Sequence, residues 1–209
     1  MIKKKLLLIG GGGHCHSIID SVIRQNEYDD IGIIDSTNCS YGEISVIGTD
    51  DDIPKLIKDG WNTVFISVGS IGNTKIRRRL YDLIKKENVD IATIIDPSAV
   101  IANDIKICKG VFIGKRAIIN VNVIIRECAI INSGAIIEHD CNIGAFSHIS
   151  PGAVLCGSVN IGSDTHIGAG TVIRQEISIG EKTIIGAGSV VVSDIPNNTV
   201  AFGNPCKCV

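Results

Sequence analysis

Aromatic side chains are scarce in this sequence. They account for 4% of the 209 residues, and there is one Trp and one Met. Large rings therefore cannot supply most of the volume of a core. Isoleucine is abundant instead, and 44% of the residues are hydrophobic. We expect a core filled by aliphatic side chains.

An excess of positive charge is also missing. The 20 Lys and Arg residues are outnumbered by 22 Asp and Glu residues, the net charge is −2, and the pI is about 6.2. Binding of a nucleic acid normally requires a basic surface. We therefore expect no nucleic-acid partner.

Long hydrophobic runs are absent as well. No apolar stretch approaches the roughly 18 residues that a membrane-spanning helix needs. The run from Leu6 to Ile9 ends in glycines and is too short for the apolar part of a signal peptide. We interpret this run as a first strand, and we expect a cytoplasmic protein without membrane insertion.

Cysteine pairs with the spacing of a metal site are missing too. The eight cysteines, at positions 15, 39, 108, 128, 141, 156, 206 and 208, include no C-x-x-C pair. In a cytosolic protein such residues are free thiols by default. The donors in His14-Cys15-His16 and Cys206-x-Cys208 are nearly adjacent in the chain, and such donors do not easily converge on one tetrahedral ion. We expect no metal.

What the sequence does contain is one apolar position that recurs every six residues. The series is Ile95, Ile101, Ile107, Ile113, Ile119, Ile125, Ile131, Ile137, Ile143, Ile149, Leu155, Ile161, Ile167, Ile173, Ile179, Ile185 and Val191. A second position lies two residues before each of these, and from Ala99 to Ser189 it holds only Ala, Ser, Thr, Cys, Val or Ile. Glycine often follows the first position.

A period of six is neither the helical 3.6 nor the period of two of a long plain strand. It is the hexapeptide signature of a parallel β-helix. Three hexapeptides make one triangular coil, so residues 18 apart stack on one face, with strands about 4.8 Å apart. The apolar residue fills the axis, and the small residue fits beside it near a corner. Such an unbroken series makes an ordinary set of aliphatic strands a poor alternative.

Residues 1–90 carry a different pattern. Apolar runs at 6–9, 31–35 and 64–69 are typical of strands, and segments at 17–23, 50–57 and 75–86 have helical character. Strands that alternate with helices predict a small Rossmann-like domain with a parallel sheet. We therefore expect an α/β domain over residues 1–90 and a β-helix domain over residues 91–209.

Four glycines at positions 10–13 separate the first strand from the first helix. Such a loop brings backbone N–H groups to a phosphate, and Asp35 ends the second strand where a sugar or base hydroxyl is usually bound. The dinucleotide fingerprint is incomplete, because Cys15 stands where its third glycine would fall. The loop favours a mononucleotide or nucleotide-sugar site. A tight turn without a ligand and a redox dinucleotide site are the alternatives.

Three of the five histidines lie in the repeat, and none occupies the axial position. His148 and His166 are one full coil apart and should stack on one face. His139 lies half a coil before His148. We therefore expect these two histidines on different faces of one subunit, able to meet only across a subunit boundary.

His139 stands between two acids, Glu138 and Asp140. A neutral imidazole is a suitable base near pH 7 when an acyl group moves from a thioester to an amine or hydroxyl. A neighbouring carboxylate can hold its tautomer and raise its basicity. The alternative for His139 is a solvated turn residue. For His166 we favour the interpretation that it has no functional role. Cys141 occupies a small inward position, which favours a core thiol over a covalent acyl carrier.

The chain resembles the hexapeptide-repeat acyltransferases. Within them it resembles the bacterial sugar acetyltransferases with an N-terminal nucleotide-binding-like domain, of the sialic acid O-acetyltransferase and nucleotide-amino-sugar N-acetyltransferase types. The resemblance covers essentially the whole chain and rests on residues 9–14, 137–144, 146–153 and 203–205. It implies a left-handed β-helix and a homotrimer with an acetyl-CoA site between neighbouring prisms.

The resemblance also implies roles for individual residues. His139 matches the family's general base, and Asp140 matches the acid that tunes it, which is often Glu. His148 matches a residue near the thioester carbonyl of acetyl-CoA, while Ala169 and Ala187 match positions whose backbone touches the CoA arm. The implied substrate-binding residues are Gly12, Gly13 and His14 in the nucleotide-sugar loop, Asp35 and Ser36 at the base, and Gly69 after the third strand.

Two departures from the family pattern stand out. Ser36 replaces an acid found in some relatives, and Pro205-Cys206-Lys207-Cys208 replaces a commoner Pro-Ala-Lys.

The expected function is acetyl-CoA-dependent acetylation of a sugar by direct transfer. We expect the acceptor to be the amino group of a nucleotide-linked 4-amino sugar for bacterial surface glycans. The alternatives are O-acetylation of sialic acid or a related sugar, a non-catalytic scaffold, and a nucleotide-binding oxidoreductase.

Overall fold

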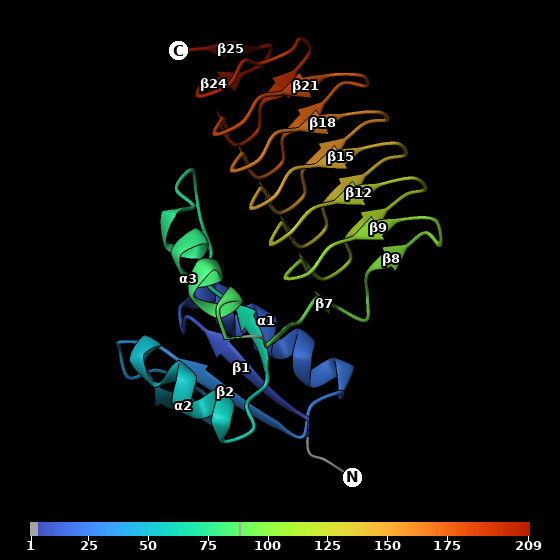
Figure 1. Ribbon diagram of the computed structural model, residues 1–209. Coiled ribbons are helices and arrows are strands. Elements are labelled where there is room, and N and C mark those ends of the chain that lie inside the picture. The colour runs from blue at the N-terminus through green and yellow to red at the C-terminus, as the bar shows by residue number, and fades with distance from the viewer. Residues whose placement is uncertain (1–3, 88) are drawn as a thin grey trace. The chain divides into compact units, whose positions relative to one another are not determined.

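The computed structural model describes residues 4–87 and 89–209, and these residues fold into two compact units. The first unit contains the residues up to Ser70 together with Lys75–Ile94. The second contains Ile71–Thr74 together with Ile95–Val209. Figure 1 shows the α/β character of the first unit and the stacked coils of the second.

The first unit is built on a six-stranded sheet with the strand order β3-β4-β2-β1-β5-β6. Its strands are β1 (Lys5–Ile9), β2 (Asp30–Ile34), β3 (Ser40–Tyr41), β4 (Ile44–Gly48), β5 (Thr63–Ile66) and β6 (Asp90–Ile91). Its helices are α1 (Gly13–Gln25), α2 (Ile53–Lys58) and α3 (Lys75–Lys85), and a 3₁₀ turn η1 spans Asp50–Asp52. The predicted alternation of strands and helices is confirmed.

Strand β1 is central to this sheet. Its residues Leu6, Leu7 and Leu8 are fully buried, as is usual for a parallel strand covered on both faces. It pairs in parallel with β2 on one side and with β5 on the other. From β1 the chain adds β2 on one side of the sheet and later β5 on the other, so the strand order switches between β1 and β5. Open parallel sheets bind ligands at such a switch point, beyond the carboxyl ends of the strands.

The hairpin of β3 and β4 was not expected from the sequence. The two strands pair antiparallel, and β4 joins the edge of the parallel sheet beside β2 with a shift in register. Residues in β4 alternate between exposed and half-buried positions, as in an edge strand. Helix α1 also begins earlier than the predicted segment 17–23, because Gly12 is its N-cap and Gly13 its first residue.

The second unit is a parallel β-helix with three faces, as expected. Face 1 contains β7 (Ile94–Ile95), β10 (Phe112–Ile113), β13 (Ile130–Ile131), β16 (His148–Ile149), β19 (His166–Ile167), β22 (Ile184–Ile185), β24 (Val200–Gly203) and β25 (Cys206–Cys208). Face 2 contains β8 (Val100–Ile101), β11 (Ile118–Ile119), β14 (Ile136–Ile137), β17 (Val154–Leu155), β20 (Val172–Ile173) and β23 (Val190–Val191). Face 3 contains β9 (Lys106–Ile107), β12 (Ile124–Ile125), β15 (Asn142–Ile143), β18 (Asn160–Ile161) and β21 (Ser178–Ile179).

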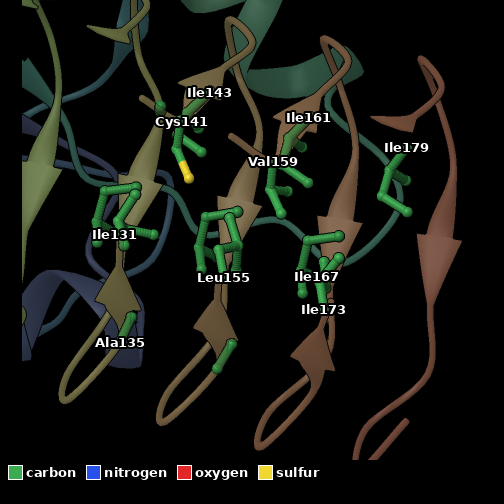
Figure 2. Close-up of a cluster of buried hydrophobic side chains, with 14 of the residues drawn as sticks. Ile131, Ala135, Cys141, Ile143, Leu155, Val159, Ile161, Ile167, Ile173 and Ile179 are labelled. Atoms are coloured by element: carbon green, nitrogen blue, oxygen red, sulfur yellow. The ribbon is translucent and has the colours of Figure 1, made fainter. Parts of the chain in front are cut away.

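The register between adjacent coils confirms three hexapeptides per coil. Ile124 pairs with Asn142 on face 3, and His148 pairs with His166 on face 1. The axial residues from position 113 to 191 are at most 4% exposed, while the first three are partly buried. Figure 2 shows axial residues of successive coils stacked inside the prism, with Cys141 beside them.

The small inward residues do more than fit the corners. Ser147 Oγ donates a 2.7 Å hydrogen bond to the Gly162 carbonyl, and Thr165 Oγ1 donates a 2.6 Å bond to the Gly180 carbonyl. Each acceptor lies in the corner of the next coil. These hydroxyls therefore satisfy corner carbonyls that would otherwise lose a partner in the interior.

The outer corners have a backbone period of their own. Every sixth residue from Gly110 to Gly188 has a φ between 52° and 75°. Glycine, Asn and Asp adopt this left-handed conformation most readily. Among the non-glycine residues at these corners are Asn122 and Asp140, which are one coil apart and therefore share one column.

Candidate active site

His139 lies at the corner that follows β14, between faces 2 and 3. Its Nδ1 is 2.7 Å from Oδ2 of Asp140, and the two side chains are 53% and 49% exposed. A carboxylate can only accept hydrogen bonds, so the proton of the neutral ring lies on Nδ1. The lone pair is therefore on Nε2. This is the arrangement that a proton acceptor needs.

The next coil provides room for this ring. Gly157 lies one coil after His139, and a side chain there would place its Cβ 2.6 Å from Nε2 and Cε1 of the imidazole. Only glycine at this position lets the ring lie against the backbone of that coil.

The two acids beside His139 are held by asparagines of the preceding coil. Asn122 Nδ2 donates to Asp140 Oδ1 at 3.1 Å, and Asn120 Nδ2 donates to Glu138 Oε2 at 2.8 Å. The hydrogen bonds from His139 and Asn122 lower the pKa of Asp140 below its usual value. Sequence reasoning missed both asparagines, although their place one coil before the acids was visible.

His148 lies on face 1, whereas His139 follows a strand of face 2, so the expected separation within one chain is confirmed. Asn132 Nδ2 lies 3.1 Å from His148 Nε2, and Asn132 Oδ1 accepts the N–H of Ser133. Because the amide nitrogen of Asn132 faces the ring, Nε2 of His148 accepts, and the neutral ring carries its proton on Nδ1. Asn132 is a further residue that the sequence did not single out.

His166 packs against His148 from the next coil. The ring centroids are 5.1 Å apart and the rings meet edge to face at 69°. His166 is 8% exposed, and its Nδ1 is buried without a hydrogen-bond partner. Burial lowers the pKa of His166 below its usual value, so burial favours the neutral form of this ring.

Two other predicted positions lie near this histidine column. Ala169 and Ala187 follow β19 and β22 of face 1, are one coil apart, and are both exposed. Their small side chains leave the backbone of this corner open to a ligand. Cys141, in contrast, is buried, its thiol donates to the Cys156 carbonyl, and burial raises its pKa to about 11. A thiol of this kind is a poor nucleophile.

The first unit holds a separate pocket of about 520 Å³ beyond the carboxyl ends of β1, β2 and β5. It is lined by Ile9, Gly10, Ile34, Asp35, Ser36, Thr49, Asp50, Asp51, Val68, Ile76, Arg79 and Leu80. Of the residues predicted to bind substrate, it contains Asp35 and Ser36. Sequence reasoning missed the contributions of residues 49–51 and of Arg79, which pairs with Asp50 at 2.8 Å.

Asp35 shapes the glycine loop. Its Oδ2 accepts the N–H of Gly11 at 2.6 Å and its Oδ1 accepts the N–H of Thr37 at 2.8 Å. These bonds, the Gly11 bond first, lower the pKa of Asp35. The carboxylate is therefore ionised and fixed in place.

The remaining predicted loop residues lie around the start of α1. A Cβ added at Gly12 or Gly13 would meet nothing within 4 Å, and neither residue has a positive φ. A Cβ at Gly69 would approach the Cβ of His14 to 3.3 Å, so the loop after β5 lies against the start of the helix. The structure thus brings Gly69 and His14 together.

Comparison with known proteins agrees with both units. Residues 5–84 match the family described as the PglD N-terminal domain, and residues 158–193 match the bacterial transferase hexapeptide family, in six repeats. The structure of PerB from Caulobacter crescentus, solved with CoA and GDP-perosamine, superposes with a TM-score of 0.93 at 32% identity. That match covers 98% of this chain and 97% of PerB.

The chain belongs to the bacterial hexapeptide-repeat sugar acetyltransferases. The acetyltransferase domain of PglB from Neisseria gonorrhoeae, solved with acetyl coenzyme A, is 31% identical with a TM-score of 0.93 over 99% of this chain and 100% of that one. WeeI from Acinetobacter baumannii, at 22% identity and a TM-score of 0.87, shares the fold. This hexapeptide-repeat sugar acetyltransferase uses acetyl-CoA as the acetyl donor.

Two further observations concern the parts of the acetyltransferase that the structure describes. None of the helices within residues 4–87 and 89–209 is both long and apolar enough to cross a membrane. Within the same residues, no three His, Cys, Asp or Glu side chains are grouped to hold a metal ion.

The buried His166 of the acetyltransferase predicts a pH-dependent stability. As the pH falls below the usual histidine pKa, the unfolded chain binds a proton at His166 more readily than the folded chain does, so stability is lost on the acid side. His166→Phe keeps a ring beside His148 and removes the unpaired Nδ1. We expect thermal denaturation to show a smaller loss of Tm between pH 7.5 and 5.5 in this variant than in the wild type.

An exposed uncharged side chain on face 3 provides the control, because Asn160→Gln removes no titratable group. That variant should keep the wild-type loss of Tm. An unchanged pH dependence in His166→Phe would show that the His166 environment is more polar than its burial indicates.

Proposed function

We propose that this enzyme acetylates the amino group of a nucleotide-linked 4-amino sugar in bacterial surface glycan biosynthesis, by direct transfer from acetyl-CoA. The observation that carries the proposal is the pairing of His139 Nδ1 with Asp140 at 2.7 Å, which leaves Nε2 as a base. Relatives support the acceptor class: PerB is described as a perosamine N-acetyltransferase and was solved with GDP-perosamine.

In the proposed step, the amine nitrogen attacks the thioester carbon and the new C–N bond forms. His139 Nε2 takes the proton that the amine loses, and the C–S bond breaks as CoA leaves. The proton can then pass to the departing thiolate, so the protein ends as it began. The ionised Asp140 stabilises the imidazolium that forms in between.

Other groups near His139 are weaker candidates for the base. Carboxylates such as Glu138 are too weakly basic alone, and the buried Cys141 remains a thiol. His148 is the competitor, and by its family position we assign it to the acetyl carbonyl instead. Ala169 and Ala187 are assigned to the CoA arm, because their exposed corner lets a ligand reach the backbone.

The nucleotide is assigned to the first unit. In this proposal the backbone N–H groups of Gly12 and Gly13 at the start of α1 bind the phosphates, and the pocket with Asp35 and Ser36 accepts the nucleoside. The open space around Gly12 and Gly13 supports this assignment, as does the position of the pocket beyond the strand ends. His14 and Gly69 border the same loop.

One other acceptor class is separable from this one. The same base would serve a hydroxyl, as in O-acetylation of sialic acid. Release of the CoA thiol, measured with UDP-, GDP- and CMP-linked amino sugars and with their hydroxyl analogues, distinguishes the two. Turnover with an amino sugar alone is the expected result, and turnover with a hydroxyl analogue alone would contradict the proposal.

A homotrimer completes the proposal, because His139 and His148 lie on different faces of one chain. Face 2 supplies a surface for it: its outward residues form an aliphatic column of Val100, Ile118, Ile136, Val154, Val172 and Val190. Val100 is 64% exposed in the single chain. A contiguous apolar surface of this kind is typical of an interface.

The trimer has a direct test. Sedimentation equilibrium at micromolar concentration should give three times the 22.2 kDa chain mass. Ile136→Asp, in the middle of the column, should dissociate the assembly, because an unpaired carboxylate would be buried in it. Asn160→Asp on face 3 is the control. A wild-type species with the mass of a single chain would contradict the proposal.

The role of His139 predicts a loss in kcat. Positioned acid–base groups contribute about 10²–10⁴-fold, so His139→Ala should lose kcat on that order while acetyl-CoA affinity is kept. The wild-type rate should fall when the medium is made acidic, because a protonated imidazole cannot accept the proton of the amine. Asp140→Asn should lose less, because the base stays in place and only the charge that stabilises the imidazolium is removed.

The Asp140→Asn change is a clean one, since Asn tolerates the left-handed conformation at this corner. If His139→Ala kept near-wild-type kcat in an assembled protein, the mechanism would be wrong and His148 would become the first candidate for the base.

The glycine loop predicts a separation of the two substrates. Gly13→Val fills space that is open in the protein, so the fold should tolerate it while the sugar nucleotide is crowded. We expect a raised KM for the sugar nucleotide and an almost unchanged KM for acetyl-CoA. Gly10→Ala is the contrast: its φ is +106° and its Cβ would contact Val68, so it should destabilise the protein. Equal losses for both substrates in Gly13→Val would indicate damaged folding.

A further inference from the structure

Asn122 is the third member of a hydrogen-bonded chain that ends at the base. Its Nδ2 donates to Asp140 Oδ1 at 3.1 Å, and Asp140 Oδ2 faces His139 Nδ1 at 2.7 Å. The two oxygens of the carboxylate are thus used by two different partners, one from each of two adjacent coils.

The backbone fixes Asn122 in this position. Its φ is 58° and that of Asp140 is 61°, so both residues occupy the left-handed corner of their coils. The Asn122 N–H donates to Asp104 O, and the Asp140 N–H donates to Val121 O. These backbone hydrogen bonds between coils hold the two corners in register. The amide of Asn122 therefore lies within hydrogen-bond distance of Asp140 Oδ1 without a large change in side-chain conformation.

We propose that Asn122 is a positioning residue of the acetyl transfer: its amide holds the carboxylate of Asp140 in the rotamer that directs His139 Nε2 toward the acceptor. This inference rests on the proposed role of His139 as the base. Without the Asn122 donor, the exposed carboxylate can rotate about its side-chain bonds, and the imidazole loses a fixed partner. Asn122 itself touches neither substrate in this proposal.

The charges around the base are few, so the effect of a charge variant at position 122 can be interpreted. Glu138 and Asp140 flank His139 on its own coil; the coil before it presents Asn120 and Asn122, and the coil after it presents Gly157 and Ser158. Glu138 is occupied by Asn120 at 2.8 Å. A new carboxylate at position 122 would therefore be added to a known set of two.

A glycine at position 122 tests the effect of the side-chain amide separately from the effect of the backbone turn. Glycine adopts a positive φ freely, so Asn122→Gly keeps the turn and removes the side-chain amide, with both its Nδ2 donor and its Oδ1. We expect kcat to fall about 3–10-fold, as for a lost hydrogen bond to a partly exposed charged group, with an unchanged KM for acetyl-CoA. Asn198→Gly makes the identical change at another left-handed corner, where φ is 56°, and should leave kcat unchanged.

A double-mutant cycle shows whether Asn122 acts through Asp140. In an Asp140→Gly background the loss caused by Asn122→Gly should disappear, because no side chain remains at position 140 to be held. The charge variant Asn122→Asp gives an independent readout: it replaces the amide donor with a third carboxylate, which cannot donate to Asp140, so kcat should fall at least as far as in Asn122→Gly. Asn198→Asp should leave kcat unchanged.

Wild-type kcat in Asn122→Gly, or an equal loss in the presence and absence of the Asp140 carboxylate, would overturn the inference. Tm and sedimentation of each variant exclude misfolding or a lost assembly as the cause. A different result would contradict the proposal that His139 is the base. In that case His139→Ala would keep its activity, whatever the result at position 122.

Discussion

The hydrogen-bonded stacking of each coil on the next, three hexapeptides further along the chain, is the constraint on which the second unit depends. It sets neighbouring strands about 4.8 Å apart, so the surroundings of an outward side chain are set by the residues one coil before and one coil after it. Gly157 makes room for His139, Asn122 holds Asp140, and His166 packs on His148. The candidate site is therefore assembled by columns, one residue from each coil.

The same register gives chemically similar side chains different surroundings. His139 stands at an open corner with a carboxylate on Nδ1, whereas His166 is buried behind His148 and has its pKa lowered by that burial. Cys141 and Asp140 are adjacent in sequence, yet one is inside the prism and the other outside. A step of one residue along a corner thus separates a core thiol from a group that can assist proton transfer.

Much of this architecture could be predicted from the sequence, since the axial and small inward positions are fixed by burial and burial leaves a clear period. The corner conformation left a weaker trace. Only some corners carry glycine, while Cys128 and Phe146 also have a positive φ, because coil-to-coil hydrogen bonds impose a backbone that these residues do not prefer. The pocket residues at 49–51 and Arg79 were missed for another reason: the turn η1 that follows β4 and the helix α3 reach the pocket only through tertiary packing.

The four glycines of the loop look equivalent in the sequence, but the structure gives them different physical roles. Gly10 is required by its φ of +106°, and Gly11 by close packing, since a Cβ there would contact Cys39 Sγ. Asp35, expected only as a ligand contact, holds this loop through the Gly11 N–H. Neither conformation nor packing explains Gly12 and Gly13. The absence of side chains at these two positions leaves the backbone at the start of α1 exposed, and its N–H groups can therefore bind an anion.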